Sequence, residues 1–179
     1  TPPIPVHVFE IQDQFIDLPS PTTTATDSQR LPVLCTRNRA DLRACLIEFG
    51  ANHEGTAWAD PDLGRFSQVY SKNGSRYWVA EDENGQIVGG VGIGPLAPGL
   101  CELQKMYCLP VARGTGLAHE LMGLALKFAK KYYSRCYLET LDNMTAAQRF
   151  YEKHGFTRTT EPVIQTEHFA CEVRYIKEL

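Results

Sequence analysis

The residues with the clearest chemical meaning form a turn with two glycines, Arg113-Gly114-Thr115-Gly116-Leu117-Ala118, which precedes an apolar repeat typical of a helix. A helix start leaves about four backbone N–H groups without partners, and the peptide dipoles place partial positive charge there. Acidic side chains often fill this position, but the turn contains none, and its glycines leave the amides open to a phosphate. Arg113 adds a guanidinium that can reach a second phosphate oxygen. The turn therefore indicates an anion site, with a plain strand-to-helix turn as the alternative.

Spacing argues against two common phosphate loops. The chain contains no G-x-x-x-x-G-K-[ST] sequence. A G-x-G-x-x-A sequence runs from Gly92 to Ala97, but Pro98-Gly99 follows where a dinucleotide-binding fold needs a helix.

Two segments carry a resemblance to a known family. Residues 109–118, LPVARGTGLA, resemble the R/Q-x-x-G-x-G/A signature of the GCN5-related N-acetyltransferase (GNAT) superfamily. Residues 146–156, AAQRFYEKHGF, resemble its A-x-x-x-Y-x-x-x-G-F segment, and the similarity covers about residues 32–179. The resemblance implies an enzyme that moves an acetyl group from acetyl-CoA directly to a primary amine of a small molecule or amino-acid-like acceptor. The alternative is a non-catalytic acyl-CoA-binding regulatory module of the same fold.

The resemblance also implies a place for the cofactor. Acyl-CoA would lie in a V-shaped split between the strands at 100–109 and 134–141, with its pyrophosphate on the turn amides and its pantetheine arm paired with nearby strand backbone. Many relatives have an Asn where Met144 stands, so Asn143 is expected either to bind the pantetheine arm or to cap the next helix. The implied cofactor-binding residues are Met106, Cys108, Arg113, Gly114, Thr115, Gly116, Leu117, Ala118 and Asn143.

Two side chains match catalytic positions of the family. Glu102 would take the proton of the amine, and the alternative is a solvated carboxylate at a strand end. Strand alternation would place Glu102, Gln104, Met106 and Cys108 on one face if no bulge intervenes. Tyr151 would protonate the departing thiolate, and its alternative is a core aromatic residue.

The other catalytic roles are less specified by the sequence. A backbone N–H near Cys108 would stabilise the oxyanion. A cysteine acyl-enzyme at Cys108 is disfavoured because no histidine stands nearby in sequence. Acceptor-lining candidates come from two loops, with surface loops of no function as the alternative: His53, Glu54, Trp58, Glu167 and His168.

The elements that must position these residues follow from apolar periodicity. Residues 1–31 are predicted to be an extension and linker with one strand at 6–11, followed by an acetyltransferase domain at 32–179. Further strands are expected at 31–37, 75–82, 85–94, 100–109, 134–141 and 168–179. The strands at 75–82 and 85–94 are expected to form a tight hairpin through Glu83-Asn84-Gly85, where an Asn-Gly pair supplies the positive backbone angles. Helices are expected at 39–50 with Asn38 as cap, at 60–71, over about four turns after 113, and at 143–155. This order predicts an α/β (α+β) fold with a mixed, mostly antiparallel sheet and helices on both faces.

Bulk properties limit the remaining possibilities. A chain of 179 residues suits one domain, and its formal charge of −3 argues against nucleic acid as a partner. No apolar run is long enough for a membrane span, so we expect a cytoplasmic protein with no membrane partner. A homodimer is a candidate assembly. Six scattered cysteines form no zinc pattern, and we expect free thiols and no metal.

Overall fold

The computed structural model describes residues 5–11, 27–160 and 170–179, and gives residues 27–33 as backbone only. Seven strands form one sheet in the order β1-β2-β3-β4-β5-β7-β6. They are β1 (Val6–Ile11), β2 (Arg76–Asp82), β3 (Ile87–Ala97), β4 (Leu100–Cys108), β5 (Arg135–Thr140), β6 (Thr157–Thr159) and β7 (Val173–Glu178). Among these described strands only the β4–β5 pair is parallel, so the predicted mixed, mostly antiparallel sheet is confirmed.

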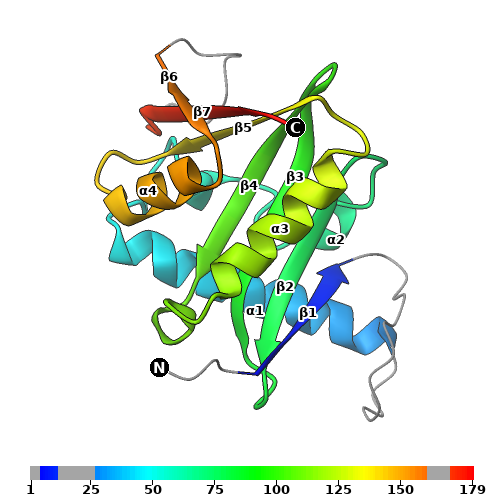
Figure 1. The fold of residues 1–179 in the computed structure, drawn as a ribbon. Helices are drawn as coiled ribbons and strands as arrows, with labels where there is room; N and C mark the ends of the chain where they lie inside the picture. Colours follow the sequence, from blue (N-terminus) through cyan, green and yellow to red (C-terminus); the bar gives the residue numbers. More distant parts are fainter. Residues whose placement is uncertain (1–4, 12–26, 161–169) are drawn as a thin grey trace.

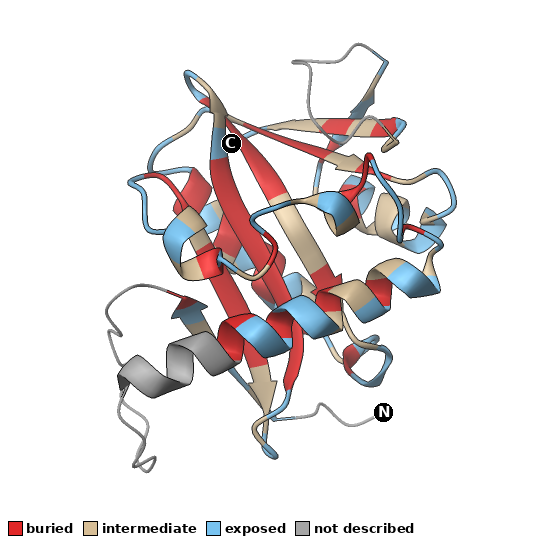
Figure 2. Ribbon diagram, turned by 180° about the vertical axis from the view of Figure 1, so that it is seen from behind, coloured by how far each residue is buried: buried red, intermediate tan, exposed pale blue. Residues whose placement is uncertain are grey.

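Helices cover both faces of the sheet, as predicted (Figures 1 and 2). On one face lie α3 (Leu117–Ala129) and α4 (Thr145–Lys153), and on the other lie α1 (Asp27–Glu48) and α2 (Phe66–Val69). Short 3₁₀ turns occur at η1 (Ala57–Ala59) and η2 (Pro110–Ala112). The buried stripe of α3 packs into one core cluster, and α1 packs into a second that contains Tyr70, Tyr77 and Tyr107.

The strand expected at 31–37 is wrong, because α1 runs through this segment. Leu34, Asn38, Leu42 and Cys45 follow one another at four, four and three residues, and all four are buried. That helical spacing buries apolar surface against the sheet, which outweighs the strand propensity of the segment. Asn38 therefore lies inside the helix instead of capping it, and its Oδ1 accepts a hydrogen bond from the Tyr107 hydroxyl at 2.5 Å.

The strand expected at 6–11 is confirmed as β1, which pairs with β2 at an edge of the sheet. Since α1 begins at Asp27, both the sheet and a helix extend to the N-terminal side of the predicted boundary at residue 31. Residues 1–4 and 12–26 of the expected extension lie outside the described residues.

Three local expectations need correction. The helix expected at 60–71 is mostly turns, and only the four residues of α2 are helical. In the confirmed β2–β3 hairpin, Gly85 has a φ of 74° but Asn84 has no positive φ, so a longer loop closes with the Asp82 N–H donating to the Gln86 carbonyl at 2.8 Å. The last strand begins at Val173, after Cys171, while Phe169 lies outside the described residues. The short strand β6 was not predicted, because its mostly exposed polar residues show no apolar alternation.

Candidate functional site

The turn before α3 is built around two glycines with left-handed backbone angles. Gly114 has a φ of 75° and Gly116 a φ of 95°, and no heavy atom lies within 4 Å of a Cβ placed at either position. Gly116 is the N-cap of α3, and as a glycine it offers no side chain to cap the helix. The Thr115 hydroxyl donates to the Ala112 carbonyl at 2.7 Å and fixes the turn. Within the described chain, the backbone amides of Gly114 and Gly116 donate to no carbonyl, which leaves them available to an anion.

The helix begins later than the sequence suggested. Because Leu117 is its first residue, the exposed Glu120 lies in the first turn, and the expectation of a first turn without an acidic residue is wrong. The Leu117 side chain lies on the buried face of α3 and belongs to the core. It can therefore offer a ligand its backbone but not its side chain.

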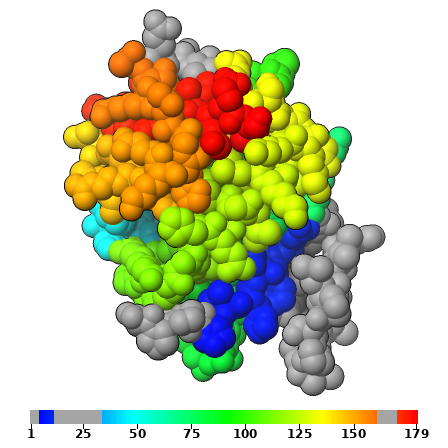
Figure 3. Space-filling view, in the orientation of Figure 1, coloured from blue at the N-terminus to red at the C-terminus, as the bar shows by residue number. Residues whose placement is uncertain are grey.

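A cavity of about 390 Å³ extends from this turn towards α4. Five of the predicted cofactor-binding residues and one predicted catalytic residue line it: Met106, Cys108, Arg113, Gly114, Ala118 and Tyr151. Other walls of the cavity were not predicted, because their residues are spaced as in ordinary amphipathic helices. They come from α1, from Phe49 directly after it, and from α4: Leu42, Cys45, Leu46, Phe49, Ala146, Ala147 and Phe150. In Figure 3 the surface of α1 (cyan) is visible between α4 (orange) and the segment that leads to the turn (green).

The cavity lies where two central strands stop pairing. β4 and β5 are paired from Leu100–Arg135 to Glu102–Tyr137, and no register pair follows. Met106 and Cys108, which line the cavity, lie further along β4. An opening between these two strands is what the resemblance implied for the cofactor.

A β-bulge interrupts β4 within this opening. Gly90 faces Tyr107 and Gly92 faces Gln104, so Lys105 and Met106 together oppose a single residue of β3. Lys105 has a φ of 50°, which is unusual for a residue other than glycine. Its side chain forms a largely buried ion pair with Asp60, with 2.5 Å between Nζ and Oδ2.

The bulge changes which side chains share a face. Tyr107 belongs to the core on the α1 side, whereas Met106 and Cys108 pack against the core on the α3 side. A shared face for Glu102, Gln104, Met106 and Cys108 was expected only without a bulge, and the bulge ends the alternation beyond Gln104. The extra residue reverses the direction of the following side chains.

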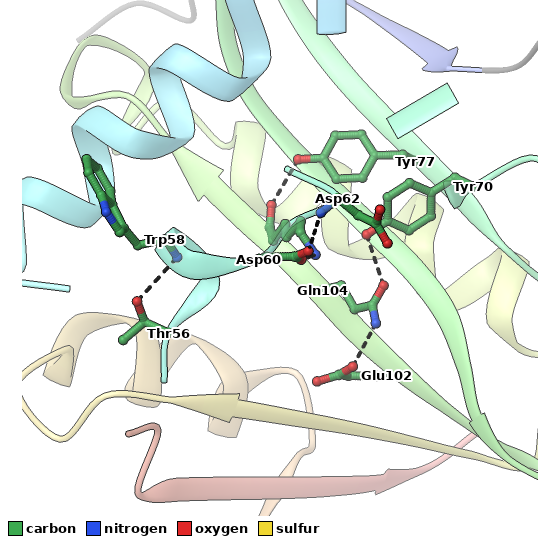
Figure 4. Close-up of polar contacts among 9 residues, drawn as sticks. Thr56, Trp58, Asp60, Asp62, Tyr70, Tyr77, Glu102 and Gln104 are labelled. Atoms are coloured by element: carbon green, nitrogen blue, oxygen red, sulfur yellow. Dashed lines mark hydrogen bonds and ion pairs between the residues drawn. The ribbon is translucent and has the colours of Figure 1, made fainter. Parts of the chain in front are cut away.

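Glu102 is buried, with only 7% of its surface exposed. Its Oε2 accepts a hydrogen bond from Gln104 Nε2 at 2.7 Å, and Gln104 Oε1 accepts one from the Tyr70 hydroxyl at 2.9 Å (Figure 4). Glu102 is therefore not the solvated strand-end carboxylate that the sequence analysis gave as the alternative. A buried, oriented carboxylate is suited to take a proton.

Tyr151 lies both in the core, as its alternative role predicted, and at the cavity, as its catalytic role requires. It is 8% exposed and belongs to the core cluster, yet it also lines the cavity. Burial, followed by the neighbouring Cys108 and Cys171, raises the pKa of Tyr151 to about 12. The phenol therefore keeps its proton at neutral pH and can donate it.

Cys108 is a poor candidate for a nucleophile. Burial raises the pKa of its thiol to about 11, with a further contribution from Cys45. The thiolate, which is the reactive form, is scarce at neutral pH. This agrees with the sequence argument against a cysteine acyl-enzyme. All six cysteines are free thiols, as expected.

Arg113 faces α1 instead of the open turn. Its Nη1 and Nη2 contact the Glu48 carboxylate at 2.6 and 2.7 Å, and its Nε donates to the Cys108 carbonyl at 3.0 Å. The guanidinium also lies 5.7 Å from the centre of the Phe49 ring. The side chain thus connects α1, β4 and the turn around the cavity.

Asn143 does not cap α4. The N-cap is Met144, and Asn143 Nδ2 donates to the Phe49 carbonyl at 2.9 Å. The expectation of a capping role is therefore wrong, and the side chain connects α4 to the end of α1. Asn143 does not line the cavity.

A second, more open cavity of about 760 Å³ lies beside the loop that follows α1. His53, Glu54 and Trp58 line it, as expected for a ligand-facing loop, while Glu167 and His168 lie outside the described residues. Arg39, Arg43 and Arg65 also line it, and no described carboxylate forms an ion pair with them. The Arg43 guanidinium lies 4.8 Å from the centre of the Trp58 ring. The cavity is therefore suited to an anionic group.

Among the described residues, none of the helices has both the length and the apolar content that crossing a membrane requires. In the same part of the chain, no three His, Cys, Asp or Glu side chains gather as metal ligands would.

Comparisons with known proteins agree with this geometry. The family model described as an acetyltransferase (GNAT) domain matches residues 73–158. The uncharacterized N-acetyltransferase YjgM of Escherichia coli strain K12 is 43% identical over 143 residues, which cover 77% of this chain and 85% of that protein. An acetyltransferase of the GNAT family from Staphylococcus aureus Mu50 superposes with a TM-score of 0.77 at 18% identity, over 97% of this chain and 99% of the other. A Bacillus anthracis protein in complex with acetyl coenzyme A superposes with a TM-score of 0.54 at 19% identity, over 64% and 68% of the two chains.

Proposed function

Since the chain belongs to the GNAT family of N-acetyltransferases, we propose that it moves an acetyl group from acetyl-CoA directly to a primary amine of a small molecule or amino-acid-like acceptor. The observation that carries the proposal is the cavity of about 390 Å³, which we call the donor cavity. It joins the turn at Gly114 and Ala118 to the Tyr151 side chain. One end of this cavity offers free amides to a pyrophosphate, and the other offers a protonated phenol to a thiolate. The acetyl-CoA complex of the related B. anthracis fold supports the same donor.

The donor would bind mainly through backbone groups. The pyrophosphate would accept hydrogen bonds from amides within 113–118, and the pantetheine arm would lie along β4 near Met106 and Cys108. The Arg113 side chain, which pairs with Glu48, would help to hold α1 against the turn. Asn143 would act in the same way, through its hydrogen bond to the end of α1.

The reaction would be a single direct transfer. Glu102 would accept a proton from the amine, the amine nitrogen would attack the thioester carbonyl carbon, and the carbon–sulfur bond would break as the amide forms. Tyr151 would give its proton to the departing thiolate, and solvent would return a proton to Tyr151 and remove one from Glu102. The raised pKa of Cys108 supports transfer without an acyl-enzyme.

Charge in the second cavity supports an amino-acid-like acceptor. Arg39, Arg43 and Arg65 outnumber the carboxylates of Glu54 and Asp60, and Asp60 is already paired with Lys105. An acceptor with a carboxylate would complement this excess of positive charge. The non-catalytic alternative has the same fold and the same donor cavity, but it would transfer no acetyl group to an acceptor in the second cavity.

A direct test is to incubate the protein with acetyl-CoA and a panel of primary amines that pairs each amino acid with its amide. We expect release of the coenzyme A thiol together with an acetylated product identified by mass, and a higher kcat/KM for the members that carry a carboxylate. Binding of acetyl-CoA with no thiol release across the panel would instead favour the non-catalytic module.

A further inference from the structure

Three glycines of β3 point to a role for side chains that the family motifs do not include. Gly90, Gly92 and Gly94 are spaced two residues apart on a strand, so they share one face. None of them has a positive φ, so their backbone conformation does not require glycine. Glycine is therefore needed at these positions because neighbouring side chains leave no room for a Cβ.

The space above the strand is filled by polar ends of larger side chains. A Cβ at Gly90 would lie 2.7 Å from the Tyr77 hydroxyl oxygen, and one at Gly92 would lie 2.7 Å from that of Tyr70. A Cβ at Gly94 would lie 2.8 Å from Gln104 Oε1. The strand thus makes room for a row of hydrogen-bonding side chains on the α1 face of the sheet.

The row ends at Glu102, and its hydrogen bonds have a defined direction. A carboxylate can only accept, so Gln104 must present its amide nitrogen to Glu102 and its amide oxygen to Tyr70. Tyr70 is 2% exposed, and burial raises its pKa well above the ordinary value, so its hydroxyl remains a donor. Figure 4 shows Tyr70, Gln104 and Glu102 in this order.

Aromatic packing holds Tyr70 in place. Its ring stacks on Phe66 with centroids 6.1 Å apart and lies 5.0 Å from the ring of Tyr77. The Tyr77 hydroxyl in turn donates to the Lys105 carbonyl at the bulge, at 3.0 Å. The Tyr70 hydroxyl, which donates the first hydrogen bond of the row, is therefore held in place by packing in the core.

We propose that Gln104 and Tyr70 are positioning residues that hold the Glu102 carboxylate in its ionised, proton-accepting orientation. This inference rests on the proposed function, in which Glu102 takes the proton of the amine. Donation from Gln104 fixes one carboxylate oxygen and favours the charged form of a buried acid. Loss of this donor would shift the balance towards the protonated form, which cannot accept a proton.

Other titratable groups also interact with Glu102. Tyr137 and Cys136 of β5, and Cys171 before β7, lie within electrostatic reach of its carboxylate. The Lys105–Asp60 ion pair lies at the bulge three residues further along β4. Substitutions at Gln104 and Tyr70 leave all of these groups in place, so the effect of the row can be measured separately.

The test is to follow the Glu102 carboxyl carbon by NMR during a pH titration of protein labelled with ¹³C-carboxyl glutamate. The Glu102 signal is the one that Glu102→Gln removes. In Gln104→Met we expect its titration midpoint to rise by about one pH unit, because a charge-assisted hydrogen bond is lost. Tyr70→Phe should shift the midpoint less in the same direction, since it removes only the hydroxyl that orients Gln104. Gln68→Met, the same change at an exposed position of α2, should leave the midpoint unchanged.

A midpoint in folded Gln104→Met that stays within about 0.2 pH units of the wild-type value would overturn the positioning role. If Gln104→Met does not fold, as judged by circular dichroism, Tyr70→Phe decides, and an unchanged midpoint there overturns the role. The titration needs no acceptor, so its outcome is separate from that of the thiol-release assay. A wild-type protein that releases no thiol with any amine would contradict the proposed function, whatever the titration shows.

Discussion

At the scale of single residues, burial decides which chemistry each side chain can perform. Tyr151 and Cys108 both line the donor cavity, and burial raises the pKa of both, to about 12 and about 11. The same environment therefore provides a proton donor and removes a nucleophile. Residue type alone could not separate these roles, because the sequence motifs give positions but not solvent exposure.

Replacing Tyr151 by Phe should lower kcat about 100-fold, since general acid catalysis contributes at least that much in typical enzymes. The KM for acetyl-CoA should stay within about twofold, because the substitution removes only a hydroxyl group. Steady-state kinetics of thiol release measure both quantities. Tyr132→Phe, at a position that is 45% exposed, serves as the control. An unchanged kcat in Tyr151→Phe would remove its role as the acid.

The pH dependence of the wild type follows from the same raised pKa. With a pKa of about 12, Tyr151 stays protonated throughout the neutral and mildly alkaline range. Any fall of kcat between pH 8 and about 10 must then come from another group. If such a fall is present in the wild type and absent in Tyr151→Phe, the assignment of a protonated phenol is wrong.

At the scale of elements, the sheet is shaped by one bulge and by the glycines of β3. The bulge at Lys105 and Met106 turns Glu102 and Gln104 towards α1, and Met106 and Cys108 towards the α3 side. The sequence predicts the strand itself well, but a bulge depends on pairing with a neighbouring strand. Periodicity along one strand therefore cannot reveal it.

The glycines of β3 should differ in their tolerance of alanine. A Cβ at Gly92 would lie within 2.8 Å of ring atoms of both Tyr70 and Tyr77, so Gly92→Ala should lower the free energy of unfolding by about 2–3 kcal/mol. Gly94→Ala meets the movable end of Gln104 and should cost about 1 kcal/mol. Gly123→Ala, in open space on α3, should stabilise the protein by about 0.5–1 kcal/mol. Urea denaturation gives the ranking, and equal effects at Gly92 and Gly94 would contradict this account of the space above β3.

Helix α1 shows the limit of local prediction most clearly. Its first part was predicted as a strand because short apolar runs fit either element, and only packing against the sheet distinguishes them. The C-terminal part was predicted as a helix because its apolar spacing is regular. The residues of α1 that line the donor cavity were missed, since a ligand wall and a core face have the same spacing.

At the scale of the whole molecule, the proposed site is assembled from parts far apart in the chain. The donor cavity combines α1, the opening along β4, the turn before α3 and one face of α4. The two family motifs supply the turn and α4, so the sequence predicts the type of donor. The proposed acceptor side is the second cavity, where Arg39 and Arg43 of α1 come together with Arg65. No sequence motif predicts that arrangement.

We propose that the pyrophosphate of acetyl-CoA binds at the turn before α3, and calorimetric titration with coenzyme A measures this binding. We expect one site in the wild type and at least about a 100-fold weaker affinity in Gly116→Glu, because a carboxylate would occupy the site of the anion. Gly116→Ala, which shares the backbone strain of a φ of 95° without the charge, should lose far less. An affinity of Gly116→Glu equal to that of the wild type would contradict the account.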